Sequence, residues 1–467
     1  MLARLLRPKD FGLVAMVTAF SLWPMNFGVN GFTEFIIQKP QISKEELNSI
    51  FWLNLFLATL LAFGFMFFGF LLVDFYSEPA LSGIATAMAT GIIFQAFSMS
   101  HLALLKREMK FTSIAILELV AVILSIIFAI AVAVWGMAYW AVVTRQLMIP
   151  IVMIGAWILC PWRPNRPQHL SGALPGLKYA VRVYCNVSLG YLMRSVDRVL
   201  IGKFHGSEPL GNYDRAYHLF AVPFNQLLFP LNSVALATLS RLKHDKERLS
   251  AYYTKAVSII AFPGTLAALV LTLSAQDLVL LLLGPKWTEA GRIVMAFGPG
   301  IAAWFVYGTH PWLHLSLGTP NRWLRWNLFS SALTVIAFIL AAPSGAVAMA
   351  IAYSGIAYVL IVPGVWYAGR PIQLSLGVVI SSVWAYFASA ISVCIFWLYL
   401  SEYWLPLNRL LMGLSPLYRI VTTVCITSFL YIALVSILQR SLRSIREILS
   451  LIPLLLSRKN PRSSDDE

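Results

Sequence analysis

Apolar blocks, each about twenty residues long, follow one another through most of this chain and are separated by short connections. A helix rises about 1.5 Å per residue, so a block of that length crosses the roughly 30 Å hydrocarbon layer of a membrane. We place the blocks at 11–29, 50–73, 81–104, 112–135, 138–160, 176–202, 209–235, 250–274, 290–316, 323–342, 344–367, 374–400 and 416–438. This series of thirteen blocks predicts an all-α, polytopic integral membrane protein with no soluble catalytic domain.

The composition agrees with a membrane setting. Hydrophobic residues make up 59% of the chain and charged residues 12%, whereas about a quarter of a soluble domain is charged. The net charge of +15 would suggest nucleic-acid binding in a soluble protein. Here the basic residues cluster in alternate connections, as the positive-inside rule requires. We therefore expect membrane lipid as a partner, and no nucleic acid.

The same charge pattern predicts the orientation. One group of alternate connections holds Lys39, Lys44, Lys106, Arg107, Lys110, Arg163, Arg166, Lys178, Arg241, Lys243, Lys246, Arg248, Arg322, Arg325 and Arg370. The other group carries few cations, and the connections 74–80 and 136–137 carry none. The cation-rich group is predicted to be cytoplasmic, together with the C-terminus. The tail 439–467 is predicted to be amphipathic, with a basic, apolar part lying on the anionic inner leaflet.

Cysteine and histidine offer no metal-binding pattern. The four cysteines lie within or at the ends of apolar blocks, without a CxxC neighbour, and the seven histidines are scattered without an HExxH motif. These residues predict neither a metal site nor a disulfide framework. We expect no cofactor and, because no catalytic nucleophile is recognisable, no enzyme activity.

Charged residues within the block 176–202 are the first candidates for function, because ionisable groups inside a bilayer are costly. At 100° per residue, one broad arc of a helix here carries Arg182, Tyr184, Asn186, Tyr191, Arg194, Asp197 and Arg198. Such an arc is typical of the wall of a polar cavity. Neutralisation of Arg194 by Asp197 within the helix is the simpler alternative, but it leaves Arg182 and Arg198 without a partner.

Two further charged residues lie inside apolar blocks. Arg145 falls within the block 138–160, and Glu118 falls in the preceding block. They either form a buried pair or take part in transport, and the sequence leaves both interpretations open. Internal prolines, among them Pro263, Pro299 and Pro311, also predict bent or broken helices in the second half of the chain.

Several segments resemble one known family of membrane proteins. They are LARLLRPKDFGLVAM (2–16), IIQKPQISKEELNSIFWLNL (36–55), LLKREMKF (104–111), YLMRSVDRVLIGKFHGSEPLGNYDRAYHLFAVP (191–223) and LLGPKWTEA (282–290). Together and in this order they resemble polysaccharide flippases of the Wzx type, in the MOP superfamily, and in particular the lipopolysaccharide and colanic-acid exporters. The resemblance implies two pseudo-symmetric six-helix lobes around a cationic cavity, often followed by two extra helices.

The resemblance also implies a domain organisation. The lobes would be residues 1–160 and 173–370, and residues 371–438 would be the additional helix pair. The family has fourteen helices, and its first helix precedes the segment that resembles residues 2–16. That first helix is missing from this sequence: either the start codon is set too late or the protein has one helix fewer, and we favour the former. The charge pattern independently predicts one further crossing before residue 1. Without it, Met1 and the cations Arg4, Arg7 and Lys9 would lie on the outer side, which the positive-inside rule disfavours.

The function that the resemblance implies is the movement of undecaprenyl-pyrophosphate-linked oligosaccharide across the bacterial inner membrane. Guanidinium groups suit pyrophosphate because they form paired hydrogen bonds with it. The expected substrate-binding residues are Arg145, Arg182, Tyr191, Arg194 and Arg198. Asp197 and Glu118 are the candidates for coupling to H⁺ or Na⁺. Enzymes of polysaccharide assembly are possible partners.

Two other functions stay open. A polysaccharide polymerase or ligase acts on the same lipid, but typically needs a large outer loop, and the connections near 275–289 and 401–415 are short and apolar. A drug or cation antiporter of the same superfamily would need acidic residues in its cavity, whereas the excess within these blocks is arginine.

Overall fold

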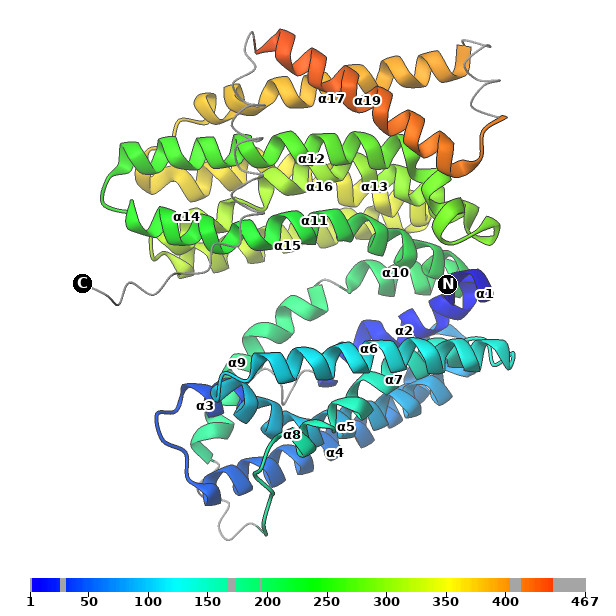
Figure 1. Cartoon of the computed structure of the whole chain (residues 1–467), viewed down its shortest axis with the longest axis vertical. Helices are drawn as coiled ribbons and strands as arrows, with labels where there is room; N and C mark the ends of the chain where they lie inside the picture. Colours follow the sequence, from blue (N-terminus) through cyan, green and yellow to red (C-terminus); the bar gives the residue numbers. More distant parts are fainter. Residues whose placement is uncertain (1, 26–30, 167–173, 194, 404–412, 440–467) are drawn as a thin grey trace, which may run out of the picture. The chain divides into compact units, whose positions relative to one another are not determined.

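The computed structural model describes residues 2–25, 31–166, 174–193, 195–403 and 413–439. These residues form helices and their connections, without a strand (Figure 1). They divide into two compact units. The first comprises residues 1–215, 282–290 and 335–349, and the second comprises 216–281, 291–334 and 350–467. The predicted lobes 1–160 and 173–370 have other limits and stay a prediction.

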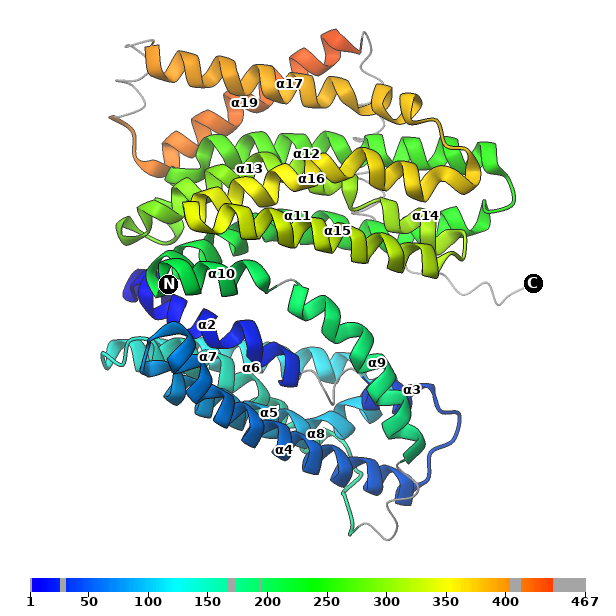
Figure 2. The same cartoon turned by 180° about the vertical axis from the view of Figure 1, so that it is seen from behind.

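The first unit contains the helices of the N-terminal half. They are α1 (Leu2–Leu5), α2 (Pro8–Met25), α3 (Phe32–Gln38), α4 (Lys44–Tyr76), α5 (Ala80–Arg107), α6 (Phe111–Val134), α7 (Trp140–Met153), α8 (Ala156–Leu159), α9 (Leu174–Met193), α10 (Val196–His205) and the start of α11 (Ser207–Arg241). The 3-10 turns η2 (Pro285–Trp287) and η3 (Ala342–Ser344) join them from later in the chain. Long helices α4 to α7 lie side by side (Figures 1 and 2).

The second unit contains most of the remaining helices. They are α12 (Lys246–Leu282), α13 (Thr288–Tyr307), α14 (His310–Ser316), α15 (Pro320–Ala341), α16 (Ala346–Gly369), η4 (Arg370–Ile372), α17 (Leu376–Tyr403) and α19 (Pro416–Leu438). Helices α11, α15 and α16 belong to both units along their length. Helices α17 and α19 lie in the segment predicted to be the additional pair, and they pack against each other (Figure 2).

In the described residues, ten helices are long and apolar enough to cross a membrane. They include α4, α5 and α6, whereas α2, the α9–α10 pair and α11 do not meet that standard. Each of the thirteen predicted blocks nevertheless contains helix. The polytopic helical class is confirmed, and the count of thirteen crossings stays a prediction.

Helix α6 shows which solvent surrounds the molecule. Its buried positions carry mostly small side chains, at Ala121, Ser125 and Ala129, whereas Leu119 and Ile127 are more than half exposed. A water-soluble protein would bury the large apolar groups. Small residues between helices and large ones facing outward are the pattern of a bundle in lipid.

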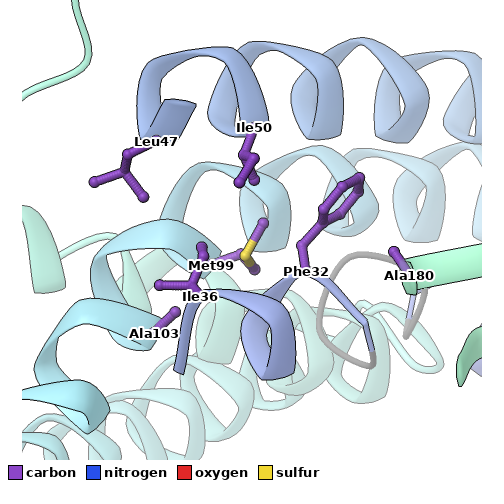
Figure 3. Close-up of a cluster of buried hydrophobic side chains, with 7 residues drawn as sticks. All are labelled: Phe32, Ile36, Leu47, Ile50, Met99, Ala103 and Ala180. Carbon is purple, nitrogen blue, oxygen red and sulfur yellow. The ribbon is translucent and has the colours of Figure 1, made fainter. Parts of the chain in front are cut away.

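A buried apolar cluster fixes the short helix α3 at one end of the first unit (Figure 3). Phe32 and Ile36 of α3 contact Ile50 of α4, Met99 of α5 and Ala180 of α9, together with Leu47 and Ala103. Residues 32–38 lie in a connection between two predicted blocks, and the packing of their apolar side chains in this cluster explains why they form a helix. It also anchors the beginning of α9.

The two predicted groups of connections lie at different ends of the first unit. At one end Arg107 donates hydrogen bonds to the carbonyls of Ile36 (3.1 Å) and Pro40 (2.8 Å), and Trp52 donates to the carbonyl of Asn165 (2.8 Å). Arg107, Pro40 and Asn165 lie in connections of the predicted cytoplasmic group, and Ile36 and Trp52 lie next to such connections.

At the other end, the cation-poor connections contact one another. Ser207 donates to the Glu78 carboxylate (3.1 Å), Lys203 donates to the carbonyl of Phe75 (2.6 Å), and a His205 ring nitrogen lies 2.7 Å from the carbonyl oxygen of Ala342. The alternation read from charge therefore sorts the connections as the fold does.

Three predicted helices are interrupted. Among the described residues, the block 138–160 divides into α7 and α8 and the block 290–316 divides into α13 and α14, while in the block 176–202 the described helices are α9, to Met193, and α10, from Val196. Two of the prolines that predicted bent or broken helices do not interrupt a helix, because Pro263 lies inside α12 and Pro299 lies inside α13. Only Pro311, in the first turn of α14, adjoins a break.

Candidate functional site

Charged side chains of α10 and α11 form a cluster in the first unit. We call Asp197, Arg198, Tyr213, Asp214 and Arg215 the arginine–aspartate cluster. The Asp214 carboxylate lies between two cations, with Oδ1 3.1 Å from Nε of Arg198 and Oδ2 2.7 Å from Nη2 of Arg215. The three side chains are largely buried, at 16%, 9% and 21% exposure for Arg198, Asp214 and Arg215. One carboxylate thus holds two arginines within the fold.

The second carboxylate of the cluster is also engaged. Asp197 is buried, and its Oδ2 accepts a hydrogen bond from the Tyr213 hydroxyl at 2.9 Å. Its Oδ1 accepts from the backbone N–H of Arg198 at 2.8 Å, in the first turn of α10. A negative charge at that end of a helix also interacts favourably with the helix dipole. Both oxygens therefore stabilise the start of α10 and its contact with α11.

Arg215 connects the cluster to α2 and α7. Its guanidinium lies 4.6 Å from the centre of the Phe11 ring, a cation–π contact. Arg145 of α7 is exposed, and the charges of Arg145 and Arg215 are close enough to repel each other. Among the described ion pairs, Asp214 binds Arg198 and Arg215, and none involves Arg145.

The helices that carry the cluster cross unusually closely. A Cβ atom at Gly12 of α2 would lie 1.6 Å from the carbonyl oxygen of Ser207, and one at Gly211 of α11 would lie 1.9 Å from that of Pro8. Only glycine permits this approach. Trp287 of η2 completes the crossing, because its Nε1 donates to the carbonyl of Ala3 at 2.8 Å.

Parts of three of the five segments with the family resemblance therefore come together in space. Residues 2–12, 196–215 and 284–287 lie far apart along the chain and contact one another around the α2–α11 crossing. Phe11 packs edge-on against Trp287, with ring centres 5.3 Å apart. In this chain those motifs build a structural junction.

The predicted site residues have different outcomes. Arg198 has a carboxylate partner, Asp214, on the next helix, where a single-helix projection cannot show it, and its role in substrate binding stays a prediction. The side chains of Arg182 and Tyr191, and all of Arg194, lie outside the described part of the chain. Glu118 is exposed on α6, and among the described ion pairs none joins it to Arg145.

Sequence reasoning missed Tyr213, Asp214 and Arg215. They form the YDR part of the segment GNYDRAY at 211–217, which the resemblance already included. Two adjacent opposite charges at the start of an apolar block were the available signal, but their partners lie on α10 and α2.

Two solved structures share the fold. Over 94% of this chain and 95% of the other, the structure is similar to the lipid II flippase MurJ in an inward closed conformation, with a TM-score of 0.73 and 13% identity. It is also similar to an inward-facing multidrug resistance MATE transporter of the MOP superfamily, with a TM-score of 0.64 and 14% identity over 80% and 92% of the chains. The chain is thus a multi-pass helical membrane protein that shares the fold of these two structures.

Sequence comparison gives the family. The chain is 22% identical over 291 residues to the lipopolysaccharide biosynthesis protein WzxC of Escherichia coli (strain K12), which covers 62% of this chain and 59% of that protein. It is 23% identical to the succinoglycan biosynthesis transport protein ExoT of Rhizobium meliloti (strain 1021), covering 64% and 61%. Residues 1–292 match the family described as "Polysaccharide biosynthesis protein", and the chain belongs to that family. It spans about three fifths of the length of these relatives.

Proposed function

We propose that this protein moves a lipid-linked oligosaccharide from one leaflet of a bacterial inner membrane to the other, for the synthesis of a surface polysaccharide. The observation that carries the proposal is the fold shared with a lipid II flippase over 94% of the chain. The relatives named for lipopolysaccharide biosynthesis and succinoglycan transport support a glycan as the cargo. No covalent bond changes in this process, so the protein needs no nucleophile.

The cationic side chains would host the anionic head of the cargo while the lipid tail stays in the bilayer. Arg145 is the best described candidate, because it is exposed and lies near a second guanidinium, that of Arg215. A pyrophosphate there would relieve their repulsion and accept charge-assisted hydrogen bonds. Arg182, Tyr191, Arg194 and Arg198 remain proposed contributors, and Arg198 is also paired with Asp214.

Coupling to an ion gradient is part of the proposal, with H⁺ or Na⁺ as the candidates. Asp197 is poorly suited, because both of its oxygens accept hydrogen bonds. Glu118 is exposed on an apolar helix, where a carboxylate is costly without a role or a partner. The orientation with a cytoplasmic C-terminus is proposed from the charge asymmetry of the connections. Docking of polysaccharide assembly enzymes on the cytoplasmic connections is likewise proposed.

The test is complementation of a strain that lacks the gene. We expect the wild-type chain to restore surface polysaccharide, and Arg145→Ala to reduce export about tenfold or more, because a lost charge-assisted hydrogen bond is worth about 1.5–3 kcal/mol. Arg145→Lys separates charge from fork geometry, and Arg248→Ala, at a 79% exposed arginine, is the control. The function would be refuted if the deletion strain itself exported polysaccharide fully and accumulated no lipid-linked oligosaccharide.

A further inference from the structure

Two buried histidines lie beside a helix break in the second unit. Helix α13 ends at Tyr307 and α14 begins at His310, with Gly308 and Thr309 between them. His310 is 3% exposed and His314, one turn later, is 0% exposed. Neither residue belongs to the arginine–aspartate cluster, and neither was a sequence-predicted site residue.

The hydrogen bonds of each ring assign its tautomer. His310 Nδ1 lies 2.6 Å from the carbonyl oxygen of Tyr307, which can only accept, so Nδ1 carries the proton. The Thr319 hydroxyl donates to the carbonyl of His314 at 3.2 Å, so its oxygen accepts from His314 Nδ1 at 3.4 Å. In both neutral rings Nε2 therefore presents a lone pair.

Those two lone pairs are not satisfied by the protein. Nε2 of His310 and Nε2 of His314 are buried, and neither has a hydrogen-bond partner in the described part of the chain. The ring centres lie 6.1 Å apart. Buried polar atoms are normally bonded, so a pair of bare basic nitrogens indicates a ligand that is bound for part of the time.

The groups around the pair suit one small positive charge. The Tyr307 ring centre is 4.4 Å from that of His310, Trp326 is 6.4 Å from His310, and Tyr367 is 5.8 Å from His314. Aromatic faces favour a cation. No carboxylate of the described residues forms a hydrogen bond or ion pair with either ring, so metal coordination by a mixed set is not favoured.

Other elements add one charge and one further hydroxyl. Arg322 of α15 stacks 4.5 Å from the centre of the Tyr367 ring on α16 and lies close enough to His314 for their charges to interact. From α12, Tyr253 reaches the break through Thr309, at 2.8 Å. Burial and the Arg322 charge oppose a proton on His314, which favours His310 as the ring that takes the proton, and the short distance between the two imidazoles opposes a second proton.

We propose that His310 and His314 form a proton-binding site that holds one proton on an Nε2 atom. Uptake forms one N–H bond, with the proton taken from a hydronium ion, and converts one imidazole into an imidazolium. If the site is on His310, the bond from Nδ1 to the Tyr307 carbonyl becomes charge-assisted and strengthens across the helix break. The assignment of this site to ion coupling rests on the proposed transport function.

The first experiment measures proton binding without a transport assay. The full chain, with ¹⁵N-labelled histidine, is reconstituted in liposomes and followed by solid-state NMR from about pH 8 to about pH 3, because burial disfavours the protonated rings. We expect imidazolium signal equal to one histidine to be lost in His310→Asn/His314→Asn, because asparagine keeps the donor at the Nδ1 position but has no base. The exposed His244→Asn is the control. Nε2 signals of the pair that stay those of neutral imidazole throughout would overturn the site, which would then hold only a buried water.

The second experiment tests coupling in cells. We expect His310→Asn to reduce polysaccharide export and to remove the dependence of export on external pH. If the His310→Asn chain does not reach the membrane, His314→Asn is tested in its place. Export with the wild-type level and pH profile in both variants would overturn the coupling role. Failure of the wild-type chain to restore export would instead refute the transport function and leave the NMR result standing.

Discussion

Nε of Arg198 lies 3.1 Å from Oδ1 of Asp214, and this ion pair joins the first turn of α10 to α11. Arg215 binds the other oxygen of the same carboxylate at 2.7 Å. Because both arginines depend on one largely buried carboxylate, Asp214 is the residue whose loss should cost most. The helical projection places Arg198 on the wall of a cavity, and this ion pair shows that a carboxylate of the next helix holds it.

The first prediction concerns that carboxylate. Asp214→Asn leaves two largely buried arginines without a negative partner, and removing one member of such a pair costs about 3–5 kcal/mol. We expect a marked fall in the thermal unfolding midpoint in detergent and in the amount of chain in the membrane. Asp245→Asn, which breaks the exposed pair with Arg248, should cost below about 1 kcal/mol. Equal effects of the two substitutions would contradict the structural role of Asp214.

The second prediction concerns the close crossing of α2 and α11. Gly12→Ala places a methyl group 1.6 Å from the Ser207 carbonyl oxygen, so the helices must separate. We expect a lower unfolding midpoint and weaker export. Gly64→Ala in α4 is the matched control, because nothing lies within 4 Å of its Cβ position, and alanine should there stabilise the helix by up to about 1 kcal/mol. A Gly12→Ala chain as stable as the Gly64→Ala chain would refute the crossing.

Much of the architecture was predictable from the sequence, because lipid imposes a simple rule. Every apolar block contains helix. In the first unit, connections that the charge alternation assigns to the same group lie at the same end and contact one another. The break beside Pro311 was predictable from that proline, whereas the other breaks were not. Pro263 and Pro299 lie within continuous helices, whereas the break after Tyr307 is stabilised by the His310 side chain, which replaces a backbone donor.

The site was predictable only in part, for a related reason. A helical projection identifies Asp197 and Arg198 as polar groups on one face of a helix, but it contains no information about the next helix. Tyr213 and Asp214, which engage them, lie on α11. The same holds for His310 and His314: their rings become a candidate site only when burial leaves both Nε2 atoms without a partner.

The third prediction concerns the additional helix pair. Helix α12 contacts α17 and α19 through polar side chains: Ser258 lies 3.0 Å from the Tyr386 hydroxyl, and Thr265 lies 2.6 Å from that of Tyr431. Tyr431→Phe removes the second contact and a bond to the Phe262 carbonyl, so we expect a loss of about 0.5–1.5 kcal/mol per bond. Unfolding in detergent measures it. Tyr399→Phe, at a 62% exposed residue, should have no effect; equal losses would show that the hydroxyl of Tyr431 does not fix the pair.

The fourth prediction tests the orientation with single cysteines. The four native cysteines are first replaced by serine, after which Met137→Cys and Lys110→Cys are introduced separately. Both positions are exposed in connections at opposite ends of α6. The positive-inside rule places the cation-rich connection at 106–110 in the cytoplasm, since cations there do not have to cross the membrane. We expect a small membrane-impermeant maleimide to label Cys at 137 in intact cells, and at 110 only after the inner membrane is permeabilised. The reverse pattern would invert the topology and with it the direction proposed for transport.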